Sequence, residues 1–306
     1  MKKVIMILVS LTVLLSGCTL SVDSVENKEG ENSEDVYNNE ETENNIEYKS
    51  SRYQRSLFYD SKDFYSTLPK NIDEKINGVK GIVCTHHLLA SEMLHEVFLK
   101  IDNIENYKKV VIIGPDHNSI DTKSIYTTQL DWMTPFGILK INQDDLERSI
   151  EYENIEIADK ILEKEHSNAA LVHFVKYYMP DVKILNLTLP GTLDLQEILE
   201  FTSFLEEEII DDATLLIASI DFSHYLDYDK ANEKDEETLK EIQERNFVNI
   251  MNFNNDNVDS PQTLVAFLEV MNRLDGKLAF INNKNSYDII SVDKDETTSY
   301  FSLIYN

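Results

Sequence analysis

Three of the seven histidines in this 306-residue sequence lie just after short apolar runs of the kind that form buried strands. They are His86, with His87 directly after it, His117 and His224, and the runs before them are 81–85, 109–114 and 214–219. In an α/β sheet, ligands bind beyond the carboxyl ends of the strands, so these imidazoles are expected to converge. Neutral imidazole is a ligand for Fe, Zn, Cu and Ni. The pattern therefore predicts a metal site at one edge of a sheet.

A hydrolytic triad is the competing chemistry. Ser223 lies directly before His224 and Asp221 lies three residues before it, so the residue types of a Ser-His-Asp triad are present. Neighbours in sequence rarely have the geometry of a triad, and the sequence has no Gly-x-Ser-x-Gly nucleophile motif. It also lacks the glycine-rich dinucleotide motif and the Walker motif. A metal site is therefore favoured.

The other histidines differ in their surroundings. His166 follows Glu165 in a loop between two helical patterns and can join the same site. His95 and His173 fall inside helical stretches, where an imidazole more often has a structural role. We therefore expect Glu165 and His166 near the site, and we expect the two helical histidines to pack in the core.

The elements that must position these side chains alternate from residue 80. Apolar runs predict strands at 81–85, 109–114, 182–187, 214–219, 278–281, 288–292 and 299–303. Apolar residues at helical spacing predict helices at 89–101, 144–150, 155–163, 169–178, 193–208, 230–252 and 263–274. This alternation favours a largely parallel central sheet with helices on both faces. We expect a single three-layer α/β domain over residues 51–306, with an antiparallel extension.

The first eighteen residues have the features of an export signal. A charged start, a short apolar stretch and small residues precede Cys18, and the stretch is shorter than the ~20 residues that a spanning helix needs. Leu-Ser-Gly-Cys at 15–18 resembles the bacterial lipobox, in which signal peptidase II cuts before a cysteine that carries diacylglycerol. The resemblance implies a signal peptide at 1–17, a lipidated Cys18 and an extracytoplasmic domain anchored to the bacterial cell membrane. A plain secretory signal with a chance cysteine is the alternative.

The charge of the chain restricts its partners. The net charge is −28, and ten acidic residues among few apolar ones predict a disordered tether over residues 18–50. Residues 51–306 still carry a net charge of −22. Such a surface repels phosphates, so nucleic acid is excluded, and we expect a ligand that is neutral, cationic or held through a metal. Two cysteines, Cys18 and Cys84, exclude a disulfide-rich scaffold.

Five short motifs follow one another in a fixed order. They are Ile-Val-Cys-Thr-His at 82–86, Ile-Gly-Pro-Asp-His at 113–117, Thr-Pro-Phe-Gly at 134–137, Glu-His-Ser at 165–167 and Ser-Ile-Asp-Phe-Ser-His-Tyr at 219–225. In order and rough spacing they resemble the Memo-like family, also called AmmeMemoRadiSam system protein B. That family is related in fold to class III extradiol ring-cleaving dioxygenases, which use non-haem Fe(II). The resemblance covers about residues 78–306.

The resemblance implies a set of metal ligands. The family's two metal-site histidines match His86 and His117, and its third metal-site residue, a cysteine, is replaced by Asp259, with Ser260 one residue away. A His-His-Asp set has the donor types of the non-haem iron triad, so Fe(II) is expected first, with Zn, Mn or Cu as alternatives. Asp and Ser before an apolar helix are also common caps. Asp259 can therefore be structural, and the metal can be absent.

The resemblance also implies the residues around the metal and two functions. His224 is expected as general acid or base, His166 as a positioning residue, and Glu165 and Asp221 as further members of the catalytic pocket. The first hypothesis is a metal-dependent, dioxygenase-like oxidoreductase of unknown substrate, with ring cleavage as an analogy from the fold. The second is a lipoprotein that binds a small molecule, a peptide or a metal in the same pocket without turnover.

Overall fold

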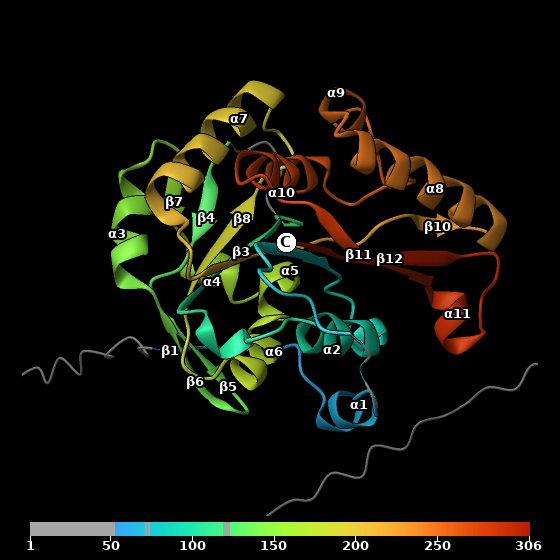
Figure 1. Ribbon diagram of the computed structural model, residues 1–306, viewed down its shortest axis with the longest axis horizontal. Coiled ribbons are helices and arrows are strands. Elements are labelled where there is room, and N and C mark those ends of the chain that lie inside the picture. The colour runs from blue at the N-terminus through green and yellow to red at the C-terminus, as the bar shows by residue number, and fades with distance from the viewer. Residues whose placement is uncertain (1–52, 71, 73, 119–122) are drawn as a thin grey trace, which may run out of the picture. The chain divides into compact units, whose positions relative to one another are not determined.

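Five parallel strands form the centre of the sheet (Figure 1). In spatial order they are β6 (Gly137–Ile141), β8 (Lys183–Leu189), β3 (Lys109–Pro115), β9 (Thr214–Ser219) and β2 (Gly81–Cys84). The structure is a computed structural model that describes residues 53–70, 72, 74–118 and 123–306. The predictions for the signal peptide, for Cys18 and for the tether lie outside these residues.

The central strands are apolar on both faces. In β3, Val111 and Ile113 belong to one buried cluster, whereas Val110 and Ile112 belong to another on the opposite face. Side chains alternate between the faces of a strand, so a continuous β-branched run must be covered on both sides. The same alternation directs the Cys84 side chain into the second cluster, where it is buried. A three-layer domain follows from this pattern.

Helices cover the two faces of the sheet as expected (Figure 1). One face is covered by α7 (Leu195–Phe204), α8 (Tyr228–Glu244), α9 (Phe247–Ile250) and α10 (Pro261–Arg273), whose apolar residues join the first cluster. The other face is covered by α1 (Ser61–Ser66), α2 (Ser91–Leu99), α3 (Gln143–Glu151) and α6 (Val172–Tyr178), whose apolar residues join the second cluster. The predicted three-layer α/β architecture is therefore confirmed.

Antiparallel strands extend both edges of the sheet. At one edge β12 (Thr297–Tyr305) runs antiparallel to β2, and both β10 (His224–Leu226) and β11 (Leu278–Asn285) run antiparallel to β12. At the other edge β5 (Asp131–Thr134) runs antiparallel to β6, and β1 (Tyr53–Arg55) runs parallel to β5. A short branch adds β4 (Ile125–Thr127), which is antiparallel to β8 and parallel to β7 (Ile155–Ile157). Only the C-terminal extension had a signal in the sequence.

Two elements differ in type from the sequence prediction. The stretch 155–163 begins as strand β7, and only its later part forms a short helix, α4 (Asp159–Leu162). The stretch 288–292 was expected to be a strand, but α11 (Ser286–Ile290) occupies its start. A capping box begins this helix, because Asn285 Oδ1 accepts from the Asp288 backbone N–H at 3.1 Å and Asp288 Oδ2 accepts from the Asn285 N–H at 3.0 Å. The capping box therefore favours a helix at the start of 288–292, where the apolar run alone predicted a strand.

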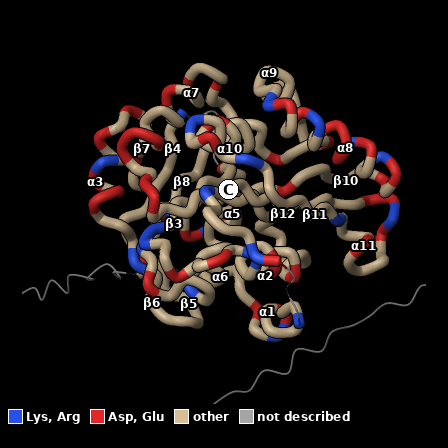
Figure 2. Tube along the Cα trace, in the orientation of Figure 1, with Lys and Arg blue, Asp and Glu red and all other residues tan. Residues whose placement is uncertain are grey.

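The described surface is acidic. Asp and Glu are spread over several helices, among them α3, α7 and α8, with fewer Lys and Arg between them (Figure 2). This distribution accords with the net charge of −28. Among the residues that the structure describes, no helix is both long and apolar enough to cross a membrane.

Candidate metal centre

Three adjacent strands end at the candidate site. The strands β3, β9 and β2 are parallel neighbours, so their carboxyl ends lie at one edge of the sheet. His117 follows β3, Asp221 follows β9 and His86 follows β2. His166 begins the short helix α5 (His166–Ala169), and Asp259 lies two residues before α10. Strand order thus brings together side chains that lie far apart in the chain.

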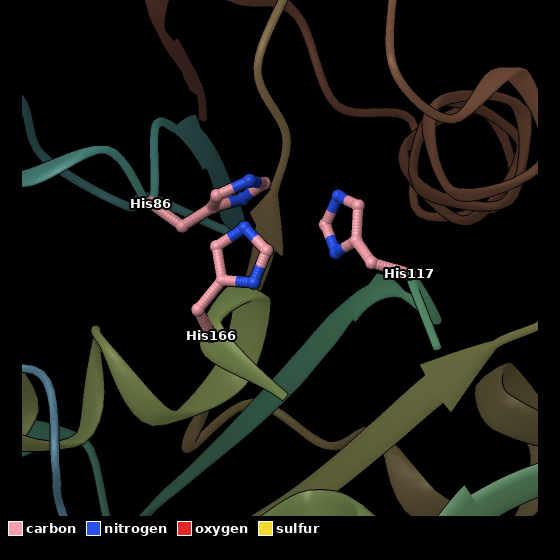
Figure 3. A group of neighbouring side chains, drawn as sticks. All are labelled: His86, His117 and His166. Carbon is pink, nitrogen blue, oxygen red and sulfur yellow. The ribbon is translucent and has the colours of Figure 1, made fainter. Parts of the chain in front are cut away.

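His86, His117 and His166 form a group of three imidazoles that face one another (Figure 3). Each can offer a ring nitrogen so that the three nitrogens lie within 4.8 Å of one another. The ring centroids are 5.2 Å apart for His86 and His117, 4.9 Å for His86 and His166, and 4.3 Å for His117 and His166. Burial is strongest for His86, whereas the other two are accessible from solvent. Such a group can bind a metal ion.

Asp259 faces two of these histidines. Its Oδ2 lies 3.5 Å from Nε2 of His86 and 3.7 Å from Nε2 of His117, and it accepts from the Asp221 backbone N–H at 3.1 Å. Its Oδ1 is buried and has no hydrogen-bond partner among the described residues. The neighbouring Ser260 is used differently, because its Oγ accepts from the Thr263 N–H at 3.1 Å and caps α10. The structure places the carboxylate, and not the hydroxyl, beside the imidazoles.

Hydrogen bonds at Nδ1 fix the tautomers of two histidines. His117 Nδ1 donates to Glu165 Oε1 at 2.8 Å. His86 Nδ1 lies 3.3 Å from Ser219 Oγ. The Ser219 hydroxyl donates its own proton to the Ser167 carbonyl, so it can only accept from His86. Both imidazoles therefore carry their hydrogen on Nδ1, which leaves Nε2 as the nitrogen for a metal.

Glu165 links the loop after β3 to the start of α5. Its carboxylate is buried and accepts from the His117 N–H at 2.9 Å, from the Ser167 N–H at 3.0 Å and from Asn118 Nδ2 at 2.8 Å. Burial alone would raise the pKa of Glu165, but the hydrogen bonds and charge of His117, together with the backbone N–H donors, lower it to about 2. Glu165 is therefore an ionised carboxylate that orients an imidazole.

The two exposed imidazoles have opposite pKa shifts. Burial lowers the pKa of His117, but hydrogen bonds and charges from Asp259 and Glu165 outweigh burial and raise it to about 10. Burial, followed by the positive charges of His86 and His117, lowers the pKa of His166 to about 4. The two carboxylates thus stabilise a positive charge at the position of His117, whereas His166 stays a neutral nitrogen donor.

A glycine allows α5 (His166–Ala169) to approach β3. A Cβ on Gly114 would lie 2.8 Å from Ser167 Oγ. Ser167 Oγ instead donates to the carbonyl of the last residue of β3 at 2.8 Å, which fixes the start of the helix at the strand end. This contact places Glu165 and His166 beside His117.

The remaining predicted site residues have different positions. The Asp221 carboxylate accepts from the Thr85 hydroxyl and, at 3.3 Å, from the His86 backbone N–H, and its Oδ2 lies 3.5 Å from His86 Nε2. His224 lies in β10, outside the three-histidine group. It acts on the neighbouring His87, whose pKa is lowered first by burial and then by the positive charges of His86 and His224. Its Nδ1 is buried without a partner among the described residues.

Sequence reasoning missed the polar residues that orient the site. Thr85 and Ser219 fall inside two of the five motifs, and this is the signal that could have found them, but neither was assigned a role. It also missed Phe58, whose ring centroid lies 6.0 Å from that of His166. The apolar segment before residue 78 carried no predicted element.

A cavity of about 570 Å³ lies at the other edge of the sheet. Lys80, just before β2, and Thr214, at the start of β9, line it together with the acidic residues Asp102, Glu206 and Asp211. Ligands of α/β domains bind at the carboxyl ends of the strands, and this cavity lies at the amino ends. No histidine or cysteine is among the residues that line it.

Fold and site together define a class: a three-layer α/β domain whose parallel strands present three histidines, able to bind a metal, at their carboxyl edge. The family model described as Memo-like protein matches residues 54–304, and the chain belongs to this family. The match begins well before residue 78, where the resemblance seen in the sequence begins, and it includes all but the first residue of β1 and the whole of α1.

Relatives in the family come from archaea and bacteria. The chain is 27% identical over 245 residues to a MEMO1 family protein of Methanosarcina mazei, covering 74% of this chain and 85% of that protein. It is 24% identical over 180 residues to one of Caldivirga maquilingensis, covering 56% and 62%. Against several such relatives the chain thus spans less than two thirds of their length. The crystal structure of the uncharacterized Escherichia coli K12 protein JW3007 has a TM-score of 0.45 at 12% identity, covering 73% of this chain and 99% of that chain.

Proposed function

We propose that this chain is an extracytoplasmic, metal-dependent member of the Memo-like family that is anchored to the cell membrane through Cys18. The observation that carries the metal site is the group formed by His86, His117 and His166, whose ring nitrogens lie within 4.8 Å of one another. In His86 and His117, a hydrogen bond occupies Nδ1 and leaves Nε2 free to bind a metal. The anchor is proposed from the lipobox-like residues 15–18 alone.

The donor set fits a divalent transition metal. His86 and His117 supply two imidazole nitrogens, and Asp259 supplies a buried carboxylate with an unpartnered oxygen among the described residues. Two His and one carboxylate are the donors of non-haem Fe(II) sites, so we propose Fe(II) first, with Zn, Mn or Cu as alternatives. A metal there supplies Lewis acidity and, in the case of iron, redox chemistry with dioxygen.

The protein residues have separate tasks in this proposal. Glu165 and Ser219 orient the imidazoles of His117 and His86 through their Nδ1 atoms. Asp221 holds the loop after β2 through the Thr85 hydroxyl. We assign proton transfer to His224, whose buried Nδ1 has no partner within the described chain. The substrate is a small molecule, neutral or cationic because the surface is acidic.

A binding role without turnover is the second candidate. His166 belongs to the same group of imidazoles as the two predicted ligands, and the Asp259 carboxylate lies beside the imidazole of His86. Four protein donors would fill the coordination of a metal such as Zn(II), and closed sites of this kind are structural. In that case the pocket would bind a metal, a peptide or a small ligand and perform no chemistry.

The test is the metal content of the full-length chain, purified anaerobically in detergent without a His tag. We expect about one metal per chain by mass spectrometry, lost in His86→Ala and in His117→Ala. His224→Ala is the matched control, since this residue lies outside the three-histidine group and should keep the metal. A wild-type chain that stays empty after incubation with Fe(II), Zn(II) and Mn(II) would exclude the metalloenzyme.

A further inference from the structure

Of the three imidazoles, His166 is held least firmly by burial and hydrogen bonds within the site. Its side chain is 42% exposed, whereas that of His86 is 3% exposed. Its Nδ1 lies 3.3 Å from Glu165 Oε1, but this oxygen already accepts from His117 Nδ1 at 2.8 Å and from the Ser167 N–H at 3.0 Å. An exposed imidazole held by a shared acceptor can take other rotamers. Something else must keep its ring over His117.

Phe58 supplies that contact from outside the site. Its ring centroid lies 6.0 Å from that of His166, with the ring planes inclined by 50°. This is within the range of favourable aromatic pairs. Among the described residues it is the one aromatic ring outside the three-histidine group that contacts His166.

The segment that carries Phe58 is itself fixed to the domain. Strand β1 pairs with β5, and the Ser56 N–H donates to the Met133 carbonyl at 3.2 Å. The Ser56 hydroxyl donates to the carbonyl of Ala169, the last residue of α5, at 3.1 Å. The ring of Tyr59, one residue after Phe58, packs 5.0 Å from that of His173. Phe58 is therefore held on both sides and is tied to the helix that His166 begins.

We propose that Phe58 is a positioning residue of the candidate metal centre, which holds the His166 imidazole over His117 and thereby keeps it available as a third nitrogen donor. The part of this inference that concerns a metal rests on the proposed function. The position of the ring is a property of the metal-free fold and can be measured on its own.

The first experiment uses the metal-free, full-length chain with selectively labelled histidines. We expect a nuclear Overhauser effect between the imidazole protons of His166 and His117, at least about threefold weaker in Phe58→Ala. The effect between His86 and His117 in the same spectrum should be unchanged. Leu57→Ala is the matched control, since Leu57 is adjacent, of similar apolar character and 58% exposed.

A second variant that keeps an apolar side chain at position 58 is included because Phe58→Ala could fail to fold. Phe58→Leu fills part of the same space without a flat ring, so we expect a His166–His117 effect between those of the wild type and of Phe58→Ala. If Phe58→Ala does not fold, Phe58→Leu decides. An unchanged effect in the folded variant means that Phe58 does not position His166, and the inference is wrong.

The second experiment measures Co(II) affinity in a double-mutant cycle with Phe58→Ala and His166→Ala. Loss of a residue that orients a metal ligand lowers affinity by roughly 10–100-fold, so we expect a fall of about tenfold in the wild-type background. In the His166→Ala background Phe58→Ala should change affinity by less than about twofold. Equal losses in both backgrounds would show general destabilisation and overturn the inference. If the wild type binds no metal, the proposed function fails, and the first experiment alone decides the position of His166.

Discussion

At the scale of single residues, Asp259 and Ser260 show where sequence reasoning ended. The pattern before the last long helix narrowed the third metal ligand to these two neighbours. Which of them faces the site depends on the backbone at the cap, since Ser260 has extended dihedral angles and turns its hydroxyl back to Thr263. A sequence does not contain that angle. The structure gives each residue its own task, so the two substitutions should separate stability from metal binding.

We expect Ser260→Ala to destabilise the protein and Asp259→Asn to weaken metal binding. Loss of a Ser N-cap costs about 1 kcal/mol of unfolding free energy, which lowers Tm by roughly 2–4 °C for a domain of this size. Asp259→Asn keeps an acceptor for the Asp221 N–H but removes the carboxylate charge beside Nε2 of His86 and His117, so metal affinity should fall more than in Ser260→Ala. Thermal melts and Zn(II) competition titrations on both variants provide the measurement. Weaker metal binding in Ser260→Ala with intact Asp259→Asn would reverse the assignment.

At the scale of elements, the long apolar runs were predicted correctly and the short strands were not. The strands β2, β3, β8 and β9 have runs that are buried on both faces, and a continuous β-branched run is typical of a central parallel strand. The edge strands β1, β4, β5 and β7 have three or four residues each and depend on partners distant in sequence. No local periodicity can reveal them. The candidate site shows the same difference, because His86 and His117, which follow buried strands, were predicted to lie there, whereas His224 lies outside the group of three and the segment around Phe58 was not predicted.

The contact between α5 and β3 leads to a prediction for Gly114. A Cβ there would come within 2.8 Å of Ser167 Oγ, so Gly114→Ala must displace the start of α5. We expect Glu165 and His166 to move away from His117, and metal affinity to fall by at least about tenfold, as for loss of an orienting residue. Isothermal titration with Zn(II) measures this. Gly191→Ala is a suitable control, because nothing lies within 4 Å of the Cβ position there; an equal loss in that variant would contradict the predicted role of the glycine.

The packing of α6 against α1 and α2 makes stability depend on pH. Burial, and then the charge of His95, lower the pKa of His173 in α6 from 6.5 to about 3. Above pH 6.5 the imidazole is neutral in both states, whereas below it only the unfolded chain takes up the proton. Stability should therefore fall as the pH drops from 6.5 toward 3, by up to about 1.4 kcal/mol per pH unit. Urea unfolding between pH 7.5 and pH 5 tests this, and His173→Phe should show a shallower dependence; an identical slope would exclude His173 as the cause.

At the scale of the whole molecule, the net charge restricts which partners can approach. Acidic residues lie on many of the described elements (Figure 2), and the sequence of the first fifty residues adds further negative charge to the total of −28. A chain with this charge is expected to be repelled by anionic lipid and nucleic acid, so the attachment to a membrane that we propose needs a covalent anchor. This expectation rests on the net charge alone and needs no knowledge of the fold.

We expect the full-length chain to sediment with membranes and to incorporate labelled fatty acid, and Cys18→Ser to abolish the label. The acidic surface should leave the unlipidated variant free of membranes even at high concentration. Fractionation of cells that express each form provides the measurement. A wild-type chain that takes up no label, or a Cys18→Ser variant that still takes it up, would refute lipidation of Cys18.

The burial of Cys84 in β2 has a practical consequence. Its thiol lies in the core between the sheet and its helices, and burial raises its pKa, so an alkylating reagent cannot reach a thiolate in the folded domain. Labelling then requires the helices on that face, among them α2, to separate from β2, which is an opening of the core. The rate at which iodoacetamide modifies Cys84 therefore measures how often the core of the folded domain opens, and the native chain needs no added probe for this measurement.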